Sequence, residues 1–174
     1  MRSSDFTNSD LVGTDLPNAD LFGTNLTNVD LGYADLTDAD LGNAKLTYAN
    51  LRYPDLTNAD FLGSDLTNAY LFGITLTDAN LRVADFTNAN LSYTDLTNAD
   101  LFGANLTDAN LLSSDLTNAD LRVADLTNVD FINAILDNTY FTCESLTDAN
   151  LINSIDLQKV RLFDSSMSEV STCN

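Results

Sequence analysis

Every fifth residue of this chain is leucine or phenylalanine, without a break, from Phe6 to Leu151. The series has thirty members, of which twenty-five are Leu and five are Phe. A period of five matches neither the two-residue period of a strand nor the roughly 3.6-residue period of a helix. A short period that stays in phase over most of a chain is typical of stacked repeat architectures. The spacing therefore predicts a solenoid.

The other positions of the five-residue unit predict short extended sides joined by turns. Two residues before the Leu or Phe stands a small residue, which is Ala in 17 of 31 units. Side chains two residues apart share a face of an extended segment, so both point inward. An outward residue lies between them, Asp in 17 units and Asn in 7. The next two residues, such as Thr-Asn or Phe-Gly, suit a turn.

A longer period sets the size of one coil. Thr follows the Leu or Phe in every other unit from Thr27 to Thr127, and Leu81-Arg82-Val83-Ala84 returns forty residues later. Four units per coil, or twenty residues, satisfy both patterns. We therefore expect an all-β solenoid with four sides over residues 4–155. About seven and a half coils would make it ~36 Å long at the ~4.8 Å spacing of strands.

The unit Ala-Asp/Asn-Leu-x-x, as in Ala19-Asp20-Leu21-Phe22-Gly23, resembles the pentapeptide-repeat family over about residues 4–155. The resemblance implies a right-handed quadrilateral β-helix, and the handedness comes from it alone. Many members of this family, abundant in cyanobacteria, have no assigned activity. The mycobacterial and plasmid-borne quinolone-resistance members mimic DNA and bind DNA gyrase. The plasmid-borne type carries loops that interrupt the repeat, and this sequence has none.

The phase of the repeat ends after Leu151, and residues 156–174 are expected to cap the last coil. A solenoid needs such a cover because its terminal coil exposes apolar core. Apolar residues at helical spacing after Asp156 predict a short helix. Ile135 and Tyr140 stand where Asp or Asn is usual and are expected to receive part of this tail. The residues expected to form the cap are Leu157, Val160, Phe163 and Met167.

The beginning of the sequence enters the repeat at once and shows neither a cap nor a signal peptide. We therefore expect a cytoplasmic protein whose first coil is open, which favours an end-to-end homodimer. The open coil would consist of Phe6, Leu11, Leu16 and Leu21. Cys143 and Cys173 lie thirty residues apart and would form either one disulfide or two free thiols. A reducing cytoplasm favours free thiols.

Composition speaks against several function classes. The net charge of −19 disfavours direct binding to nucleic acid or to an anionic membrane, and no apolar run is long enough to cross a bilayer. Histidine, the commonest general base and metal ligand, is absent. Glu144 is the one acid out of register, and it is expected to face solvent. The glycine-rich motif of calcium-binding β-rolls is also missing. We expect no enzyme, no cofactor and no metal.

Folding the sequence at twenty residues per coil gathers acid on two neighbouring sides. The expected acidic face consists of Asp15, Asp35, Asp55, Asp95 and Asp115, the stack Asp20, Asp40, Asp60, Asp100 and Asp120, and the corner residues Asp38 and Asp78. No basic residue falls in these columns. Two such stacks carry about one charge per ~2.4 Å, against one per ~1.7 Å in duplex DNA. The face suits a DNA mimic, whereas the simpler interpretation is that Asp and Asn satisfy turns.

The other two sides carry mixed aromatic, aliphatic and Arg residues, which protein interfaces enrich. The candidate protein-contact residues are Arg52, Tyr53, Phe72, Tyr93 and Phe102. Rows of Thr on the remaining sides also resemble ice-binding surfaces, although Thr is equally suited to a β-corner. The best interpretation is a non-enzymatic scaffold that binds a protein partner of unknown identity. The alternative is an acidic DNA mimic that binds a DNA-binding enzyme such as gyrase.

Overall fold

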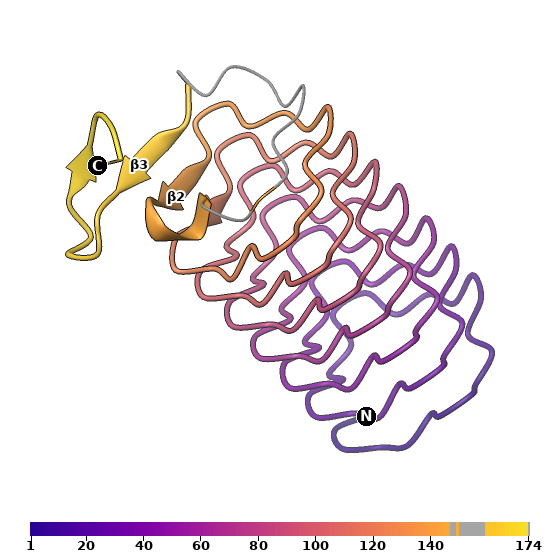
Figure 1. The fold of residues 1–174 in the computed structure, drawn as a ribbon. Helices are drawn as coiled ribbons and strands as arrows, with labels where there is room; N and C mark the ends of the chain where they lie inside the picture. The colour runs from indigo at the N-terminus through magenta and orange to yellow at the C-terminus, as the bar shows by residue number, and fades with distance from the viewer. Residues whose placement is uncertain (147–148, 150–158, 174) are drawn as a thin grey trace.

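The computed structural model describes residues 1–146, 149 and 159–173, which form a stack of coils with a small hairpin at the C-terminal end (Figure 1). Single-residue parallel bridges join residues twenty apart, beginning with Asp5 to Asn25 and ending with Asp115 to Ile135. This register confirms the expected solenoid with four units per coil. The right-handed sense and the number of coils stay predictions. The predicted boundary between residues 155 and 156 lies outside the described residues.

Backbone hydrogen bonds between coils hold the stack together. Within one unit, the N–H of Leu41 donates to the carbonyl of Asp60 in the next coil at 2.7 Å. The N–H of Asn43 donates to Leu62 at 2.8 Å, and that of Asp40 donates back to Ala19 in the preceding coil at 2.9 Å. The same three bonds recur in most units, so the ladder, rather than any long strand, supplies the β-structure.

Each corner contains a residue in the left-handed conformation. The second residue after the Leu or Phe has a positive φ in every unit from Ser3 to Asn138, with values between 49° and 68°. The corner is closed by a bond from the third residue, as from the N–H of Ala44 to Leu41 at 3.0 Å. Asn and Gly tolerate this conformation, which explains their frequency here. Val83 and Val123 adopt it too, although β-branched residues do so at a cost.

The outward Asp and Asn residues complete these corners. In most units whose outward residue is Asp or Asn, the side-chain Oδ1 of that residue accepts the N–H of the residue two positions later, which follows the Leu or Phe. The N–H of Thr117 donates to Oδ1 of Asp115 at 2.9 Å, and its hydroxyl donates to the same oxygen at 2.6 Å. Asp15 is an exception because Pro17 has no N–H to donate. The acid columns therefore have a structural role.

The core is a column of buried Leu, Phe and Ala side chains. From Leu21 to Leu136 the inward Leu and Phe residues are at most 2% exposed. Phe6, Leu11 and Leu16 in the first coil are only partly buried. Leu21 is buried, so its expected place in the open coil is wrong. It is covered because the N–H of Ser3 pairs with Phe22 at 3.0 Å and extends the ladder over it.

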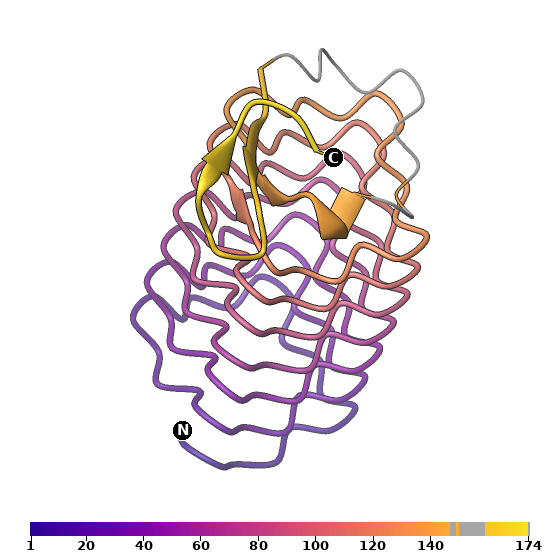
Figure 2. The same ribbon diagram turned by 60° about the vertical axis from the view of Figure 1, so that its left-hand side comes forward.

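A β-hairpin stands where a helix was expected. The regular elements are β1 (Asp120–Leu121), β2 (Tyr140–Thr142), the single 3-10 turn η1 (Glu144–Leu146), β3 (Arg161–Phe163) and β4 (Glu169–Val170). Strand β3 pairs in parallel with β2 and antiparallel with β4, so the hairpin continues one side of the solenoid (Figure 2). The helical prediction is therefore wrong for residues 159–173. Helical spacing misled because β3 pairs with residues of β2 that lie 21 positions earlier, so strand pairing and not a helix places its apolar residues.

The hairpin covers part of the last coils. Phe163 is buried, and its ring stacks on Tyr140 with centroids 5.9 Å apart. Val160 packs partly buried against the core, whereas Leu157 lies outside the described residues. Met167 is half-buried at the hairpin turn with a φ of 63°. Ile135 stays exposed.

Cys143 and Cys173 form a disulfide that ties the chain after β4 to the residue between β2 and η1. The expectation of free thiols is therefore wrong. Sequence separation alone could not decide it, because the two residues meet only when β3 folds back against β2. In the part of the chain that the structure describes, no helix has the length and apolarity needed to cross a bilayer.

We expect Asp115→Ala to lower the free energy of unfolding by about 1 kcal/mol, because the N–H of Thr117 loses its acceptor. Asp115→Asn keeps an oxygen at the same place and should lose less than half as much. Urea denaturation followed by circular dichroism measures both. Equal losses in the two variants would contradict the role assigned to this oxygen.

The double substitution Cys143→Ser with Cys173→Ser should destabilise the hairpin selectively. Closing a loop of 30 residues stabilises a folded state by about 3–4 kcal/mol in the chain-entropy estimate. Coils distant from the hairpin should be unaffected because repeats interact mainly with their neighbours. Hydrogen exchange at the N–H of Arg161, which donates to Thr139, should accelerate, while that of Leu41 should not change. Acceleration at both sites would contradict a local role.

Candidate protein-interaction surfaces

One of the two expected acid stacks is largely neutralised by arginine. Arg2 and Arg122 approach Asp20 and Asp120 with N–O distances of 2.6 Å, and Arg82 approaches Asp100 at 3.0 Å. Nη2 of Arg2 also lies 3.6 Å from Oδ2 of Asp40. Asp60, the remaining member, accepts a bond from the amide of Asn80 at 2.9 Å. The expectation that this region holds no base is therefore wrong, because Arg side chains reach into it from the adjoining column.

The second stack keeps its charge. Asp15, Asp35, Asp55, Asp95 and Asp115 make no ion pair within the described residues, and we call them the acidic row. Thr75 interrupts the row between Asp55 and Asp95. One stack alone carries about one charge per ~4.8 Å, well below the one per ~1.7 Å of duplex DNA. The charge density that suggested DNA mimicry is thus reduced by about half.

The two corner acids lie in ladders of amide side chains. Oδ1 of Asp38 accepts from Nδ2 of Asn58 at 3.1 Å, and that of Asp78 accepts from Asn98 at 3.0 Å. These bonds link successive coils at the corner next to the acidic row. Both residues remain exposed.

Phe102 belongs to a series of Arg and aromatic side chains that leads to the hairpin. The guanidinium of Arg82 lies 4.5 Å from its ring centroid, and that of Arg122 lies 5.9 Å away on the other side. Arg122 also lies 5.0 Å from the ring of Phe163. These contacts are favourable cation–π pairs. Phe102 is half-buried, already contacts arginines of this chain, and lies apart from the other candidate contact residues.

Tyr33, Tyr53, Phe72 and Tyr93 form a continuous exposed ladder, which we call the aromatic ridge. Successive ring centroids are 5.5, 6.1 and 5.4 Å apart. The three tyrosines are 67%, 49% and 55% exposed, and Phe72 is half-buried. Gly73 makes room for the ladder, since a Cβ there would lie 3.2 Å from Cε1 of Tyr53. Tyr33 and Tyr53 are stacked, whereas Phe72 meets Tyr53 edge-on and Tyr93 at a tilt, so the four rings make a continuous aromatic surface along this corner.

The candidate Arg52 borders the ridge. It is exposed and lines a hollow of about 310 Å³ together with Asp30, Asn50 and the rings of Tyr33 and Tyr53. The Oδ1 atom of Asn50 is buried there without a hydrogen-bond partner in the described structure. Tyr33 was absent from the candidate residues, although its position twenty residues before Tyr53 is a signal that the coil period provides.

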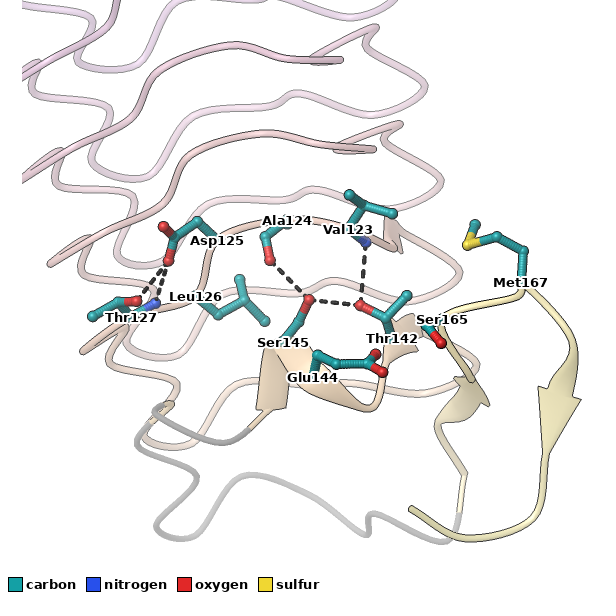
Figure 3. Close-up of a pocket in the computed structure, with 10 residues that line it drawn as sticks. All are labelled: Val123, Ala124, Asp125, Leu126, Thr127, Thr142, Glu144, Ser145, Ser165 and Met167. Carbon is teal, nitrogen blue, oxygen red and sulfur yellow. Dashed lines mark hydrogen bonds between the residues drawn. The ribbon is translucent and has the colours of Figure 1, made fainter. Parts of the chain in front are cut away.

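A second hollow, of about 430 Å³, lies between the last coils and the hairpin turn (Figure 3). Glu144 lines it and is exposed, while Ser145 donates to the carbonyl of Ala124 at 2.8 Å. The turn η1 therefore displaces Glu144 from the inward position that the repeat assigns to it. Thr142 and Ser145 bond to each other at 2.7 Å. Residues 1–146, 149 and 159–173 contain no cluster of acids and cysteines that could hold a metal ion.

The Thr rows are engaged in the corners. The hydroxyls of Thr37, Thr57 and Thr117 donate to the Asp two residues earlier at 2.6–2.7 Å. Their regular spacing follows from the coil, which supports the β-corner interpretation over ice binding.

Hydrogen bonds from Thr lower the pKa of several of these acids. The hydroxyl and then the N–H of the following Thr hold the pKa of Asp5, Asp35 and Asp125 below the ordinary value. Arg2, by its hydrogen bond, lowers the pKa of Asp20. A carboxylate with a lowered pKa stabilises the folded state above the ordinary pKa, and this contribution is lost as the pH falls through the lowered value.

We therefore expect a pH-dependent difference between the native protein and the triple variant Asp5→Asn, Asp35→Asn and Asp125→Asn. Between pH 6 and pH 3, urea denaturation should show the native protein losing stability relative to the variant, because Asn does not titrate. The change should begin near the ordinary value of 3.8. A constant difference over this range would contradict the lowered pKa values.

Comparison with known proteins gives the family and the fold. The profile described as Pentapeptide repeats matches with 8 copies, whose ranges together span residues 1–168. No curated protein is significantly similar. The crystal structure of HetL, a pentapeptide repeat protein involved in heterocyst differentiation regulation from the cyanobacterium Nostoc sp. strain PCC 7120, has a TM-score of 0.71. It is 29% identical, and the match covers 97% of this chain and 81% of HetL.

Two further structures are also similar. QnrB1, a plasmid-mediated fluoroquinolone resistance protein, is 19% identical over 92% of this chain and 90% of its own, with a TM-score of 0.44. The pentapeptide repeat protein alr5209 from Nostoc PCC 7120 is 34% identical over 71% of this chain and 84% of its own, with a TM-score of 0.25. Because the repeat profile matches nearly the whole length and the register of twenty runs through the described coils, the chain belongs to the pentapeptide-repeat family.

Proposed function

We propose that this protein is a non-enzymatic scaffold that binds a protein partner through the aromatic ridge. The observation that carries the proposal is the exposed ladder of Tyr33, Tyr53, Phe72 and Tyr93 on a strongly acidic protein. Tyr is enriched at protein interfaces because it offers a large apolar area together with a hydroxyl. The ridge rests on a rigid backbone ladder, which lowers the entropic cost of binding.

The chemistry of the described surface supports a binding role over catalysis. Each Asp of the repeat has equivalents in neighbouring coils, so none has the unusual environment that a catalytic carboxylate needs. Glu144, the exception, is exposed. HetL, which shares the fold, is named for a part in the regulation of differentiation, and regulation by protein contact is the role that we propose here.

DNA mimicry is the second candidate, and the acidic row supports it. Asp35, Asp55, Asp95 and Asp115 carry charge without ion pairs in the described structure. The arginines paired with the neighbouring stack weigh against it, because they lower the charge density. A gyrase supercoiling assay separates the two candidates: inhibition at micromolar protein would favour the mimic.

The disulfide bears on the proposed localisation. Disulfides persist in oxidising compartments and are rare in the cytoplasm. The bridge between Cys143 and Cys173 therefore weighs against the cytoplasmic expectation and favours a compartment in which it stays oxidised.

We expect Tyr53→Ser, Phe72→Ser and Tyr93→Ser together to abolish capture of the partner in a pull-down from the native host. The rings are exposed, so the urea midpoint should change little. The control is Tyr48→Ser, an exposed tyrosine outside the ridge. The proposal fails if the triple variant captures the same proteins as the native chain.

A further inference from the structure

We infer that the aromatic ridge and the acidic row form one binding surface, whose partner is a protein segment with apolar side chains flanked by Lys or Arg. This inference rests on the proposed function and adds the chemistry of the partner. It joins two features that the sequence treated as separate candidates.

The first support is position. Each ridge tyrosine at a corner is followed two residues later by a member of the acidic row: Tyr33 by Asp35, Tyr53 by Asp55, and Tyr93 by Asp95. Parallel bridges join Asp35 to Asp55 and Asp95 to Asp115, so the row runs along the stack in the same direction as the ridge. A partner that covers the rings must therefore lie next to the carboxylates.

The second support is that these carboxylates are available. Oδ1 of Asp55 accepts the N–H and the hydroxyl of Thr57, and Oδ1 of Asp95 accepts the N–H of Thr97. Oδ2 of both residues accepts no hydrogen bond within the described structure. In the neighbouring stack, by contrast, the Oδ2 atoms of Asp20, Asp100 and Asp120 are bound by arginine. Asp55 and Asp95 thus each offer an unused oxygen to a cationic donor, while the coil between them has Thr75 in this position.

The third support is the opposite flank of the ridge, which is less acidic: Asp30 lies beside Tyr33, but no acid follows it along the next four coils. The outward residues there are Asn50, Tyr70, Asn90 and Asn110. Tyr70 is 53% exposed and adds apolar area. An approaching segment therefore meets a row of carboxylates on one side of the rings, and on the other side mostly neutral groups with Asp30 and Arg52 at one end. This asymmetry favours basic residues along one edge of the partner.

The arrangement of the rings argues against other occupants. Tyr33 and Tyr53 stack on each other with an interplanar angle of 26°, so part of each ring face is already covered. Such rings offer less free face for stacking on a sugar. A second copy of this chain would bring another net charge of −19 to the interface, and the two copies would repel each other. A basic partner is instead attracted by the acidic protein. Charge complementarity therefore favours a basic protein segment.

The experiment selects binders from a random library of displayed 12-residue peptides on the immobilised protein. The triple ridge variant Tyr53→Ser, Phe72→Ser and Tyr93→Ser serves for counterselection. We expect enrichment of peptides that combine apolar residues with Lys or Arg. Affinities of the enriched peptides are then measured by fluorescence anisotropy at two salt concentrations, and binding should weaken at the higher one.

Substitutions within the row provide the decisive comparison. Asp55→Asn with Asp95→Asn keeps the turn oxygens but removes two charges, and we expect about a tenfold loss of affinity. The matched control, Asp85→Asn with Asp125→Asn, removes two charges from a side away from the ridge, where both acids bond to Thr in the same way as Asp55. It should change the affinity less than about twofold.

The outcomes separate this inference from the proposed function. The proposed partner chemistry would be wrong if the enriched peptides lacked basic residues. It would also be wrong if they bound the Asp55→Asn, Asp95→Asn variant as tightly as the native protein. Either result would leave the ridge as a binding surface. Peptides that bind the ridge variant as tightly as the native protein would overturn both this inference and the proposed function. A selection that enriches no peptide would do the same. Light scattering tests for a second copy as the occupant. If the native chain self-associates and the ridge variant does not, the occupant is a second copy and the inference is wrong.

Discussion

The structure depends on a hydrogen-bonded register in which each residue meets the one twenty positions along the chain. This register works only because every unit places one residue in the left-handed conformation, which turns the chain at the same point in each coil. The inward Leu and Phe residues of successive coils then form one buried core. An insertion that stayed within a side, instead of looping out, would move later side chains to other faces, and the unbroken phase of the sequence avoids this.

The same constraint gives the acidic residues two roles. An outward Asp uses one carboxylate oxygen to accept the N–H that the corner leaves without a partner, and the second oxygen faces outward. Where an Arg stands in the adjoining column, as at Arg82 and Arg122, that second oxygen is bound within the protein. Where Thr stands instead, as after Asp55, the oxygen stays available. A surface of uniform composition thereby acquires one neutralised side and one charged side.

The functional proposals depend on departures from the repeat. Tyr at the left-handed position of several coils is unfavourable compared with Asn or Gly, yet it places the rings of Tyr33, Tyr53 and Tyr93 on one line. Local departures from the most stable choice are common at binding surfaces. At the C-terminal end, the Arg and aromatic series from Arg82 to Phe163 instead stabilises the attachment of the hairpin. The aromatic ridge is therefore proposed to bind a partner, whereas the Arg and aromatic series holds the hairpin.

The sequence by itself determined the solenoid, its twenty-residue coil, the buried residues and the columns into which the outward residues fall. It could do so because a strict period leaves one register that buries every Leu and Phe. The conformation of residues 159–173, the disulfide, and the pairing of Arg2, Arg82 and Arg122 with acids were decided only by the tertiary structure. These depend on contacts between residues that are not related by the repeat, or on the direction a long side chain takes between two columns. Periodicity assigns a residue to a face, but the reach of its side chain across that face is set by its neighbours in space.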